Sequence, residues 1–336
     1  MARGMRPRLL VLALGAAFLL AGCGSEQSTL SPASHPAHEI ERLWWFMMAG
    51  AWVVFGGALA FLVIAWLRRS APGWPLIGER EGFNVGLVVF FGMGVPVVVL
   101  TVLFAFANFH VMAATRAPAQ GSTALTVEVV GHQWWWEVRY PRSGAVTANE
   151  IHIPAKTRVA LEVKTADVIH SFWIPELNRK IDMIPGRTSR ILLYADKPGV
   201  YRGQCSEFCG LQHAHMGLEV VADPPQRFQS WLANMAGPAR SPSGSRAMSG
   251  RNVFLSQPCA GCHTIRGTDA AGRLGPDLTH LADRSTIAAL TVPNDRAHLA
   301  EWIVDPQHLK PGNKMPALNL SNAQLDDLLA YLESLK

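Results

Sequence analysis

Sulfur and imidazole side chains gather in one short segment of this 336-residue chain. Residues 205–216 contain Cys205, Cys209, His213, His215 and Met216, and a further histidine, His170, lies upstream. Thiolate, thioether and imidazole groups are the ligands that suit copper or zinc. We therefore expect a metal site here.

The two cysteines indicate which kind of metal site this is. A blue-copper site uses one cysteine, whereas two cysteines separated by three residues can bridge two copper ions, with one histidine on each ion. Two bridged ions can share one electron, which suits an electron relay. Cys205 and Cys209 could instead form a disulfide in an exported domain. The nearby His170, His213 and Met216 favour copper over that alternative.

A second cluster lies near the C-terminus. Cys259, Cys262 and His263 form the C-x-x-C-H signature of c-type haem attachment. Two thiols on one helical turn can form thioethers to haem, and the adjacent histidine then meets the iron. Met315 lies in a proline- and glycine-containing segment and is the candidate for the other axial ligand. His/Met ligation raises the reduction potential of haem iron.

The region around the first cluster has a strand-like pattern. From about Thr123, apolar and polar residues alternate with period two, and turn signals separate the runs. We predict an all-β sandwich or barrel over residues 120–235.

The region around the second cluster is different in composition. Residues 236–246 are small, polar and rich in proline and glycine, which predicts a flexible linker. In residues 247–336, a capping box at Ser321 and Gln324 precedes leucines at helical spacing, so we predict a short, mostly helical domain. Three histidines there lack ligand-like neighbours and are expected at the surface: His280, His298 and His308.

The N-terminal segment carries export signals. Residues 1–22 have a basic start and an apolar stretch, which predict a secretory signal peptide. Cys23 follows small residues in a way that resembles the lipobox of bacterial lipoproteins, which implies lipidation there. Residues 23–42 would then form a periplasmic N-terminal segment.

Two apolar runs follow, and we predict that they form a transmembrane hairpin. Residues 43–67 and 83–109 contain no Asp, Glu, Lys or Arg, and each exceeds the roughly 20 residues that a membrane-spanning helix needs. Residues 68–82 carry arginines, which favour a cytoplasmic loop. Both ends of the hairpin would then face outward.

The overall composition agrees with a membrane protein. Hydrophobic residues make up 49% of the chain and charged residues only 16%. The formal net charge is +5, without the clustered Lys and Arg of a nucleic-acid surface, so we expect no nucleic-acid partner.

From about residue 40 to 235, the chain resembles cytochrome c oxidase subunit II. The matching motifs are Gly131 to Trp136, Asp167 to Trp173, Ile184 to Arg187, and Gly203 to Met216. The resemblance implies a cupredoxin-like domain that holds a dinuclear copper A centre. The ligands that it implies are the side chains of His170, Cys205, Cys209, His213 and Met216 and the backbone carbonyl of Glu207.

The resemblance also implies further roles. The carboxylate of Glu207 would help to bind a magnesium ion shared with subunit I. Trp134 matches the aromatic residue through which electrons arrive from cytochrome c, with core packing as its alternative role. The family spacing selects His213 over His215 as ligand. No residue is assigned to proton uptake, because Val89 stands where many relatives have a glutamate.

Residues 247–336 resemble a class I cytochrome c, which implies covalent haem at Cys259 and Cys262 and axial ligation by His263 and Met315. The whole chain then resembles subunit II of a caa-type haem–copper oxidase. It would be a multidomain protein with a two-helix transmembrane hairpin, a cupredoxin-like all-β domain and an all-α cytochrome c domain. The hairpin would lie in the bacterial inner membrane, with both domains on the periplasmic side.

The implied partners are subunit I with haem a and copper B, subunit III, membrane lipid, and an upstream donor such as a bc complex or a small cytochrome. Two related classes of protein are set aside, and a non-catalytic function stays as the alternative. Quinol oxidase subunit II lacks the copper ligands, and nitrous oxide reductase lacks the hairpin and the haem domain. A copper chaperone would not require two coppers and one haem per chain. A free redox carrier would not co-purify with a large subunit that contains haem a.

Overall fold

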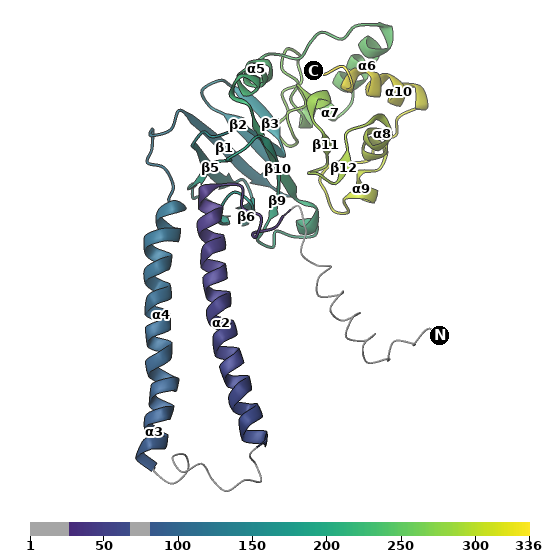
Figure 1. The fold of residues 1–336 in the computed structure, drawn as a ribbon. Helices are drawn as coiled ribbons and strands as arrows, with labels where there is room; N and C mark the ends of the chain where they lie inside the picture. Colours follow the sequence, from purple (N-terminus) through teal and green to yellow (C-terminus); the bar gives the residue numbers. More distant parts are fainter. Residues whose placement is uncertain (1–26, 68–80) are drawn as a thin grey trace, which may run out of the picture.

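The computed structural model describes residues 27–67 and 81–336. A helical hairpin leads into a β-sandwich, and a small helical domain lies beside the sandwich (Figure 1). The predicted signal peptide, Cys23 and most of the predicted loop 68–82 lie outside the described residues.

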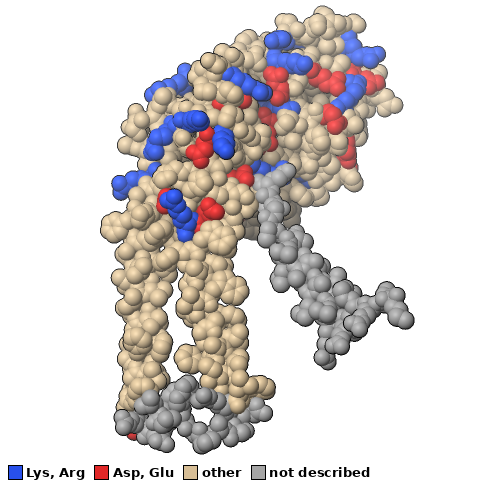
Figure 2. Space-filling view, viewed as in Figure 1, with Lys and Arg blue, Asp and Glu red and all other residues tan. Residues whose placement is uncertain are grey.

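The hairpin consists of two long apolar helices, and both are long enough to cross a membrane. The first is α2 (His35–Leu67), with a mean hydropathy of 2.2, and the second runs continuously over Glu81–Met112, with a mean hydropathy of 2.7. The second is divided into α3 (Glu81–Val89), η1 (Phe90–Gly94), α4 (Val95–Phe106) and η2 (Ala107–Met112). Charged side chains gather on the β-sandwich and the C-terminal domain, whereas the middle parts of the two long helices lack them (Figure 2).

The outer end of α2 is joined directly to the β-sandwich. The helix begins at His35, eight residues before the predicted span, and Ser34 accepts a hydrogen bond from the backbone N–H of Ala37 as an N-cap. The Ser34 hydroxyl donates to the carbonyl of Leu177, and the backbone N–H of Ala33 donates to the sandwich at 2.8 Å. The helix and the sandwich therefore form one connected unit.

The sandwich contains two five-stranded sheets. The first has the order β3-β2-β1-β5-β8, and the second has the order β4-β10-β9-β6-β7. The strands of the first sheet are β1 (Leu125–His132), β2 (Trp135–Tyr140), β3 (Ala145–Ala148), β5 (Val159–Thr165) and β8 (Ser189–Leu193). Those of the second are β4 (Glu150–Pro154), β6 (His170–Trp173), β7 (Ile181–Met183), β9 (Gly199–Cys205) and β10 (Gly217–Asp223).

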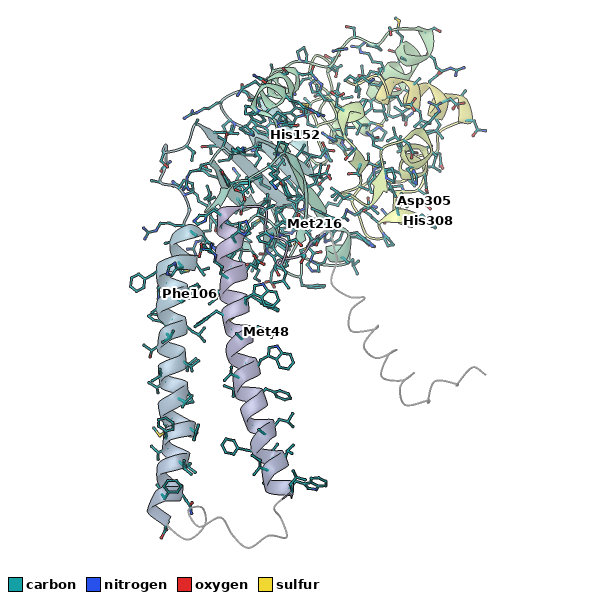
Figure 3. All side chains as sticks on the ribbon, viewed as in Figure 1. Met48, Phe106, His152, Met216, Asp305 and His308 are labelled. Atoms are coloured by element: carbon teal, nitrogen blue, oxygen red, sulfur yellow. The ribbon has the colours of Figure 1, made fainter. Side chains whose placement is uncertain are left out.

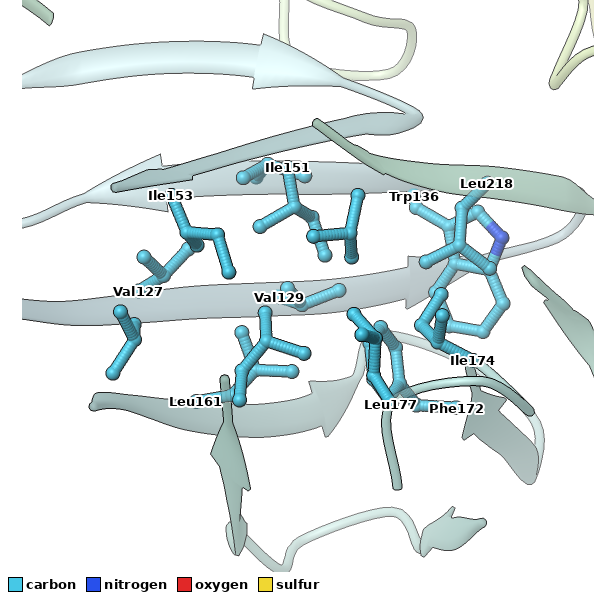
Figure 4. Close-up of a cluster of buried hydrophobic side chains, with 14 of the residues drawn as sticks. Val127, Val129, Trp136, Ile151, Ile153, Leu161, Phe172, Ile174, Leu177 and Leu218 are labelled. Atoms are coloured by element: carbon cyan, nitrogen blue, oxygen red, sulfur yellow. The ribbon is translucent and has the colours of Figure 1, made fainter. Parts of the chain in front are cut away.

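The core lies between these sheets (Figure 4). Val127 and Val129 of β1 face Ile151 and Ile153 of β4, and all four are fully buried. The predicted period-two alternation is therefore present, because alternate residues of a strand point to the same face. Helix α5 (Pro225–Ala236) packs against strands of both sheets, adds Phe228 and Met235 to the same core, and ends the domain.

The C-terminal domain is mainly helical. Its helices are α6 (Ser245–Ser256), α7 (Cys259–Cys262), η4 (Leu281–Asp283), α8 (Arg296–Val304), α9 (Pro306–Leu309) and α10 (Asn322–Leu332), and a two-residue strand pair, β11 (Thr286–Ile287) with β12 (Val292–Pro293), is added to them. The predicted capping box of Ser321 and Gln324 begins α10. Helices α6 and α10 pack closely at Gly250, where a Cβ would lie 1.9 Å from the carbonyl oxygen of Asp327.

The connection between the domains differs from the predicted flexible linker. Residues 237–244 join α5 to α6, and the backbone N–H of Ala239 donates to the carbonyl of Arg266 at 3.0 Å. The Arg266 guanidinium in turn donates to the carbonyls of Met235 and Ala236 at the end of α5. These bonds hold the start of the linker against the cytochrome domain.

The same contact buries a histidine that was expected at the surface. His280 is only 2% exposed, and its Nε2 lies 3.2 Å from the carbonyl oxygen of Gly237. The surface prediction for His280 was therefore wrong, because its burial comes from the packed linker. His298 is partly exposed, and His308 is largely exposed, as expected.

Candidate metal centres

Two neighbouring strands position the first metal centre. His170 begins β6 and Cys205 ends β9, and these strands pair with Phe172 opposite Cys205. The loop after Cys205 returns to β10, and the backbone N–H of Cys205 donates to the carbonyl of Met216 at 3.0 Å. The loop is thus closed at its base, which brings its first and last ligands together. Met216 lies at the end of the sandwich next to the cytochrome domain (Figure 3).

One half of the centre surrounds the sulfur of Cys205. This Sγ lies 3.8 Å from Nδ1 of His170 and 3.2 Å from the carbonyl oxygen of Glu207. It also lies 3.8 Å from Sγ of Cys209.

The other half surrounds the sulfur of Cys209. Its Sγ lies 3.6 Å from Nδ1 of His213 and 3.8 Å from Sδ of Met216. Each sulfur therefore has its own imidazole, and the two halves meet at the pair of sulfurs. All six predicted ligands are brought together, and soft donors in this arrangement fit copper.

The centre is shielded from water. His170, Cys205, Cys209 and Met216 are all buried. Hydrogen bonding to Cys209 and to His170 lowers the pKa of Cys205, whereas the bond to Cys205 and burial raise the pKa of Cys209. One thiolate thus forms readily, and a metal ion would displace the remaining proton because metal ligation requires thiolate.

Asp167 orients the first imidazole, a role that no spacing pattern in the sequence indicates. Its Oδ1 lies 2.8 Å from Nε2 of His170, so Nδ1 faces Cys205. Burial alone would raise the pKa of Asp167, but hydrogen bonds from His170 and from the backbone of Gln133 and Val168 lower it to about 2. A carboxylate on the distal nitrogen of a ligand histidine fixes its ring orientation.

Gly131 is required by the same imidazole. A Cβ at this position would lie 2.9 Å from Cδ2 of His170 and 3.3 Å from Cε of Met183. Any side chain here would displace the His170 ring, which explains a glycine within strand β1.

The residues considered as alternatives lie elsewhere. His215 is exposed, and its Nδ1 pairs with Gln212 at 2.8 Å instead of facing a sulfur. Cys205 and Cys209 are free thiols, not a disulfide. Among the residues that the structure describes, one group of His, Cys, Asp or Glu has ligand atoms close enough to hold an ion, and it contains His170, Cys205 and Cys209. It does not include the carboxylate of Glu207, so the magnesium role stays a prediction.

The second centre is a cavity of about 260 Å³. Cys259, Cys262, His263 and Met315 all line it, together with mostly apolar side chains such as Leu299 and Ile303. An apolar cavity with two thiols and a facing histidine and methionine fits a covalently bound haem.

The proximal histidine is fixed by its backbone surroundings. Nδ1 of His263 lies 2.8 Å from the carbonyl oxygen of Pro276, which leaves Nε2 as the free ring nitrogen. Burial lowers the pKa of His263, so the neutral imidazole that iron requires is favoured. A Cβ at Gly275 would lie 2.4 Å from the His263 ring, so only glycine fits beneath it.

The loop that carries Met315 is held by internal hydrogen bonds. The backbone N–H of Met315 donates to Oδ1 of Asn313 at 2.8 Å, and Nε2 of Gln307 donates to the carbonyl of Met315 at 3.1 Å. Asn313 also donates to the carbonyls of Pro306 and Lys310. The loop therefore holds Met315 at the cavity without a regular helix or strand.

Trp134 connects the two centres. Its Nε1 donates to the carbonyl of Cys209 at 3.0 Å, and the same residue lines the haem cavity. Gln133 and Trp135 line the cavity as well, so the copper domain forms part of its wall. One residue thus contacts a predicted copper ligand and lines the predicted haem site.

The fold and these two sites define a membrane-attached redox protein with a cupredoxin-like domain and a c-type cytochrome domain. The family model for cytochrome c oxidase subunit II, periplasmic domain, matches residues 142–223, and the cytochrome c model matches residues 247–336. Cytochrome c oxidase subunit 2 of Alkalihalophilus pseudofirmus is 36% identical over 293 residues, which cover 84% of this chain and 82% of that protein. The chain belongs to the cytochrome c oxidase subunit II family.

A second curated relative matches over more of the chain, and a solved domain matches over part of it. Cytochrome c oxidase subunit 2 of Bacillus subtilis is 29% identical over 350 residues, which cover 98% of each protein. The solved periplasmic domain of subunit II (CoxB) of Bradyrhizobium japonicum is 32% identical and covers 36% of this chain and 96% of its own, with a TM-score of 0.34.

Family membership fixes the coarse function. The chain is subunit II of a haem–copper oxidase, with an electron-transfer role and a cytochrome c domain added at its C-terminus. It carries copper in the β-sandwich domain and haem in the C-terminal domain, and it associates with subunit I in the membrane, with its domains on the outer side.

Proposed function

We propose that this chain accepts electrons at its cytochrome domain, passes them to a dinuclear copper A centre in its β-sandwich, and delivers them to subunit I. Subunit I would reduce oxygen to water there and pump protons. Haem iron and the copper pair, when bound, supply reversible one-electron chemistry. The chain's own residues hold these groups, exclude water and shorten the path between them.

The ligand set follows from the distances around the two sulfurs. His170 and the Glu207 carbonyl would complete the site at Cys205, and His213 and Met216 would complete the site at Cys209. Two bridging thiolates would share charge between both ions. A buried, preformed site changes little when its charge changes, which favours rapid electron transfer.

The haem ligands follow from the cavity. Cys259 and Cys262 lie on the single turn of α7 and would bind the haem covalently. His263 and Met315 would be the axial ligands, because both line the same cavity.

The observation that carries the proposal is the position of Trp134. Its indole N–H is bonded to the carbonyl of Cys209, and the same residue lines the haem cavity. A continuous path through one side chain and one hydrogen bond suits a relay. A copper chaperone would have no use for such a connection, and a chaperone site also needs no buried Met216.

Exposed apolar residues mark a surface for subunit I. Val168 and Ile169 precede His170, and Phe208 packs edge-on against His213 with 5.8 Å between ring centroids. All three side chains are exposed, and Phe208 is 75% exposed. Contiguous exposed apolar patches mark protein–protein contact sites, and these residues lie next to or contact predicted copper ligands. We assign this apolar surface, Val168, Ile169 and Phe208, to subunit I.

The remaining roles extend this proposal. Glu207 would share a magnesium ion with subunit I, and subunit III would complete the complex. The donor would be a bc complex or a small cytochrome. Residues 1–22 would be removed as a signal peptide and Cys23 lipidated, so mass spectrometry of the purified chain should find a lipid-modified N-terminal cysteine.

Metal counting and a single substitution test the proposal. Purified oxidase should contain two copper A ions and one haem c per copy of this chain. Trp134→Phe removes the indole N–H and should slow transfer from haem c to copper at least about tenfold, equivalent to about 1.4 kcal/mol in the barrier. Trp231→Phe, a matched change on α5, should leave the rate unchanged. One copper per chain, or equal rates in both variants, would contradict the proposal.

A further inference from the structure

Lys310 is a buried amine at the junction of the two domains. Its side chain is only 2% exposed. Nζ lies 2.9 Å from the carbonyl oxygen of Trp134, 2.8 Å from that of His215 and 3.1 Å from that of Ala288. An ammonium group has three donors, so these three carbonyls satisfy it completely.

The three acceptors come from both domains. Trp134 and His215 belong to the copper domain, and Ala288 belongs to the cytochrome domain. Separation of the domains would remove two of the three partners. Burial also lowers the pKa of Lys310 to about 7, so the site is a costly place for an amine. A costly amine that has two of its three partners only in the docked arrangement favours a role in docking.

Two further hydrogen bonds near Lys310 also join the copper domain to the cytochrome domain. Nε2 of Gln212 donates to the carbonyl of Pro311 at 2.8 Å, and the backbone N–H of Gly217 donates to the carbonyl of Ala289 at 3.2 Å. Residues 288–290 all have positive φ angles although none is glycine. Non-glycine residues rarely adopt this conformation, and here it presents two successive carbonyls to Lys310 and Gly217.

Lys310 also belongs to the loop that holds Met315. The carbonyl of Lys310 accepts from Nδ2 of Asn313 at 2.7 Å, and Oδ1 of Asn313 accepts from the backbone N–H of Met315. The amine therefore contacts the backbone of Trp134 on one side, and its own backbone is joined to the haem-ligand loop on the other.

We propose that Lys310 is a positioning residue that fixes the cytochrome domain in one docked orientation, with its haem cavity against Trp134. The cytochrome domain is then fixed against the copper domain in one orientation. It does not diffuse on a flexible linker before each electron transfer. This inference rests on the proposed electron path from the cytochrome domain to copper.

The test compares Lys310→Met with Lys336→Met in the intact oxidase. Lys336 is an exposed lysine of the same domain, so its variant makes the same chemical change away from the interface. Lys310→Met should retain both copper ions and the haem. Its haem-to-copper transfer should slow at least about tenfold and should become dependent on solvent viscosity, because the domain must find its pose before each transfer. Lys336→Met should behave as the unmodified protein.

Hydrogen exchange gives a readout that does not depend on electron transfer. The amide of Gly217 is protected by a carbonyl of the other domain. Its exchange should accelerate in Lys310→Met but not in Lys336→Met, while amides in the centre of β1 keep their protection. A structural defect in the sandwich would instead accelerate both sets.

Two outcomes would overturn the inference. One is an unchanged, viscosity-independent transfer rate in Lys310→Met, and the other is unchanged Gly217 exchange. If Lys310→Met fails to load its metals, Lys310→Gln decides, because its shorter side chain has only two donors and cannot satisfy all three carbonyls. A wild-type rate in Lys310→Gln with wild-type exchange would refute the role. A complete absence of haem-to-copper transfer in the unmodified protein would refute the proposed electron path instead.

Discussion

Nε2 of His170 lies 2.8 Å from Oδ1 of Asp167, and this pair determines which imidazole nitrogen faces the sulfur of Cys205. Asp167 also accepts hydrogen bonds from the backbone of Gln133 and Val168. It therefore joins the metal centre to the backbone immediately before Trp134. The carboxylate holds both the ligand and the start of the proposed electron path.

Asp167→Asn should weaken copper binding without unfolding the sandwich. An amide keeps the size of the carboxylate but loses its charge and one acceptor oxygen. Loss of such a partner typically costs about 10- to 100-fold in metal affinity. Competition with a copper chelator measures the change, and Asp182→Asn, at an exposed aspartate, should retain full affinity. Equal affinities in the two variants would show that Asp167 does not orient the ligand.

Met315→Ala should leave haem attached through Cys259 and Cys262 but lower its reduction potential. Methionine ligation raises the reduction potential of haem iron. Axial ligands set haem potentials over a range of ~0.8 V, and we expect Met315→Ala to lower the potential by roughly a tenth of that range or more. Redox titration measures the shift, and the methionine–iron charge-transfer band should disappear. Met248→Ala, at an exposed methionine of α6, is the control. A potential that stays constant in Met315→Ala would require another axial ligand.

His152 should make the stability of the β-sandwich fall with rising pH. Burial alone would lower the pKa of His152, but hydrogen bonds to Asp223 and Glu150 more than offset it and raise the pKa above its ordinary 6.5. A group with a raised folded pKa stabilises the fold fully below its unfolded pKa and loses that contribution as pH rises through the folded value. Stability should therefore decline above pH 6.5.

Thermal unfolding of the full chain at a series of pH values checks this expectation. His152→Asn should be destabilised relative to the unmodified chain at low pH, and the difference should shrink above pH 6.5. His298→Asn, at a partly exposed histidine, should not show this pattern. A difference that is independent of pH in His152→Asn would mean that His152 contributes through packing alone, for example by its stacking on Trp231 at 3.9 Å.

Phe208→Ser should weaken association with subunit I while both coppers remain bound. The ring is exposed beside His213, and loss of a buried aromatic anchor at an interface commonly costs about 2 kcal/mol or more. The yield of subunit I that co-purifies with the variant in detergent measures the effect. Val304→Ser, on an exposed face of α8, serves as the matched control. Undiminished co-purification of subunit I with Phe208→Ser would place the contact elsewhere.

Local chemistry explains why much of this molecule could be predicted. Cys205, Cys209, His213 and Met216 lie in one loop, so a metal site there could be predicted without knowledge of the fold, and the family spacing then selected His213 over His215. The capping box of Ser321 depends on residues only three positions apart. His170 is distant in sequence, and it was assigned by resemblance rather than by geometry.

The features that were missed depend on distant backbone groups. Lys310 is bonded to three carbonyls, and a carbonyl belongs to every residue, so no sequence pattern marks it. His280 was expected at the surface because it lacks ligand-like neighbours in the sequence. It is buried because the linker, at Gly237, packs against the cytochrome domain. Asp167 stands within one of the matching motifs, but its role became clear only when the direction of the His170 ring was known.

The continuous helix α2 sets the height of the copper domain above the bilayer. The helix runs for 33 residues, about 50 Å at 1.5 Å per residue, and its first turn is bonded to the sandwich through Ser34. A continuous helix resists shortening, so α2 fixes the distance between the β-sandwich and the far end of the hairpin. Insertion of a few residues into α2 would both raise and rotate the β-sandwich, since each added residue turns a helix by about 100°.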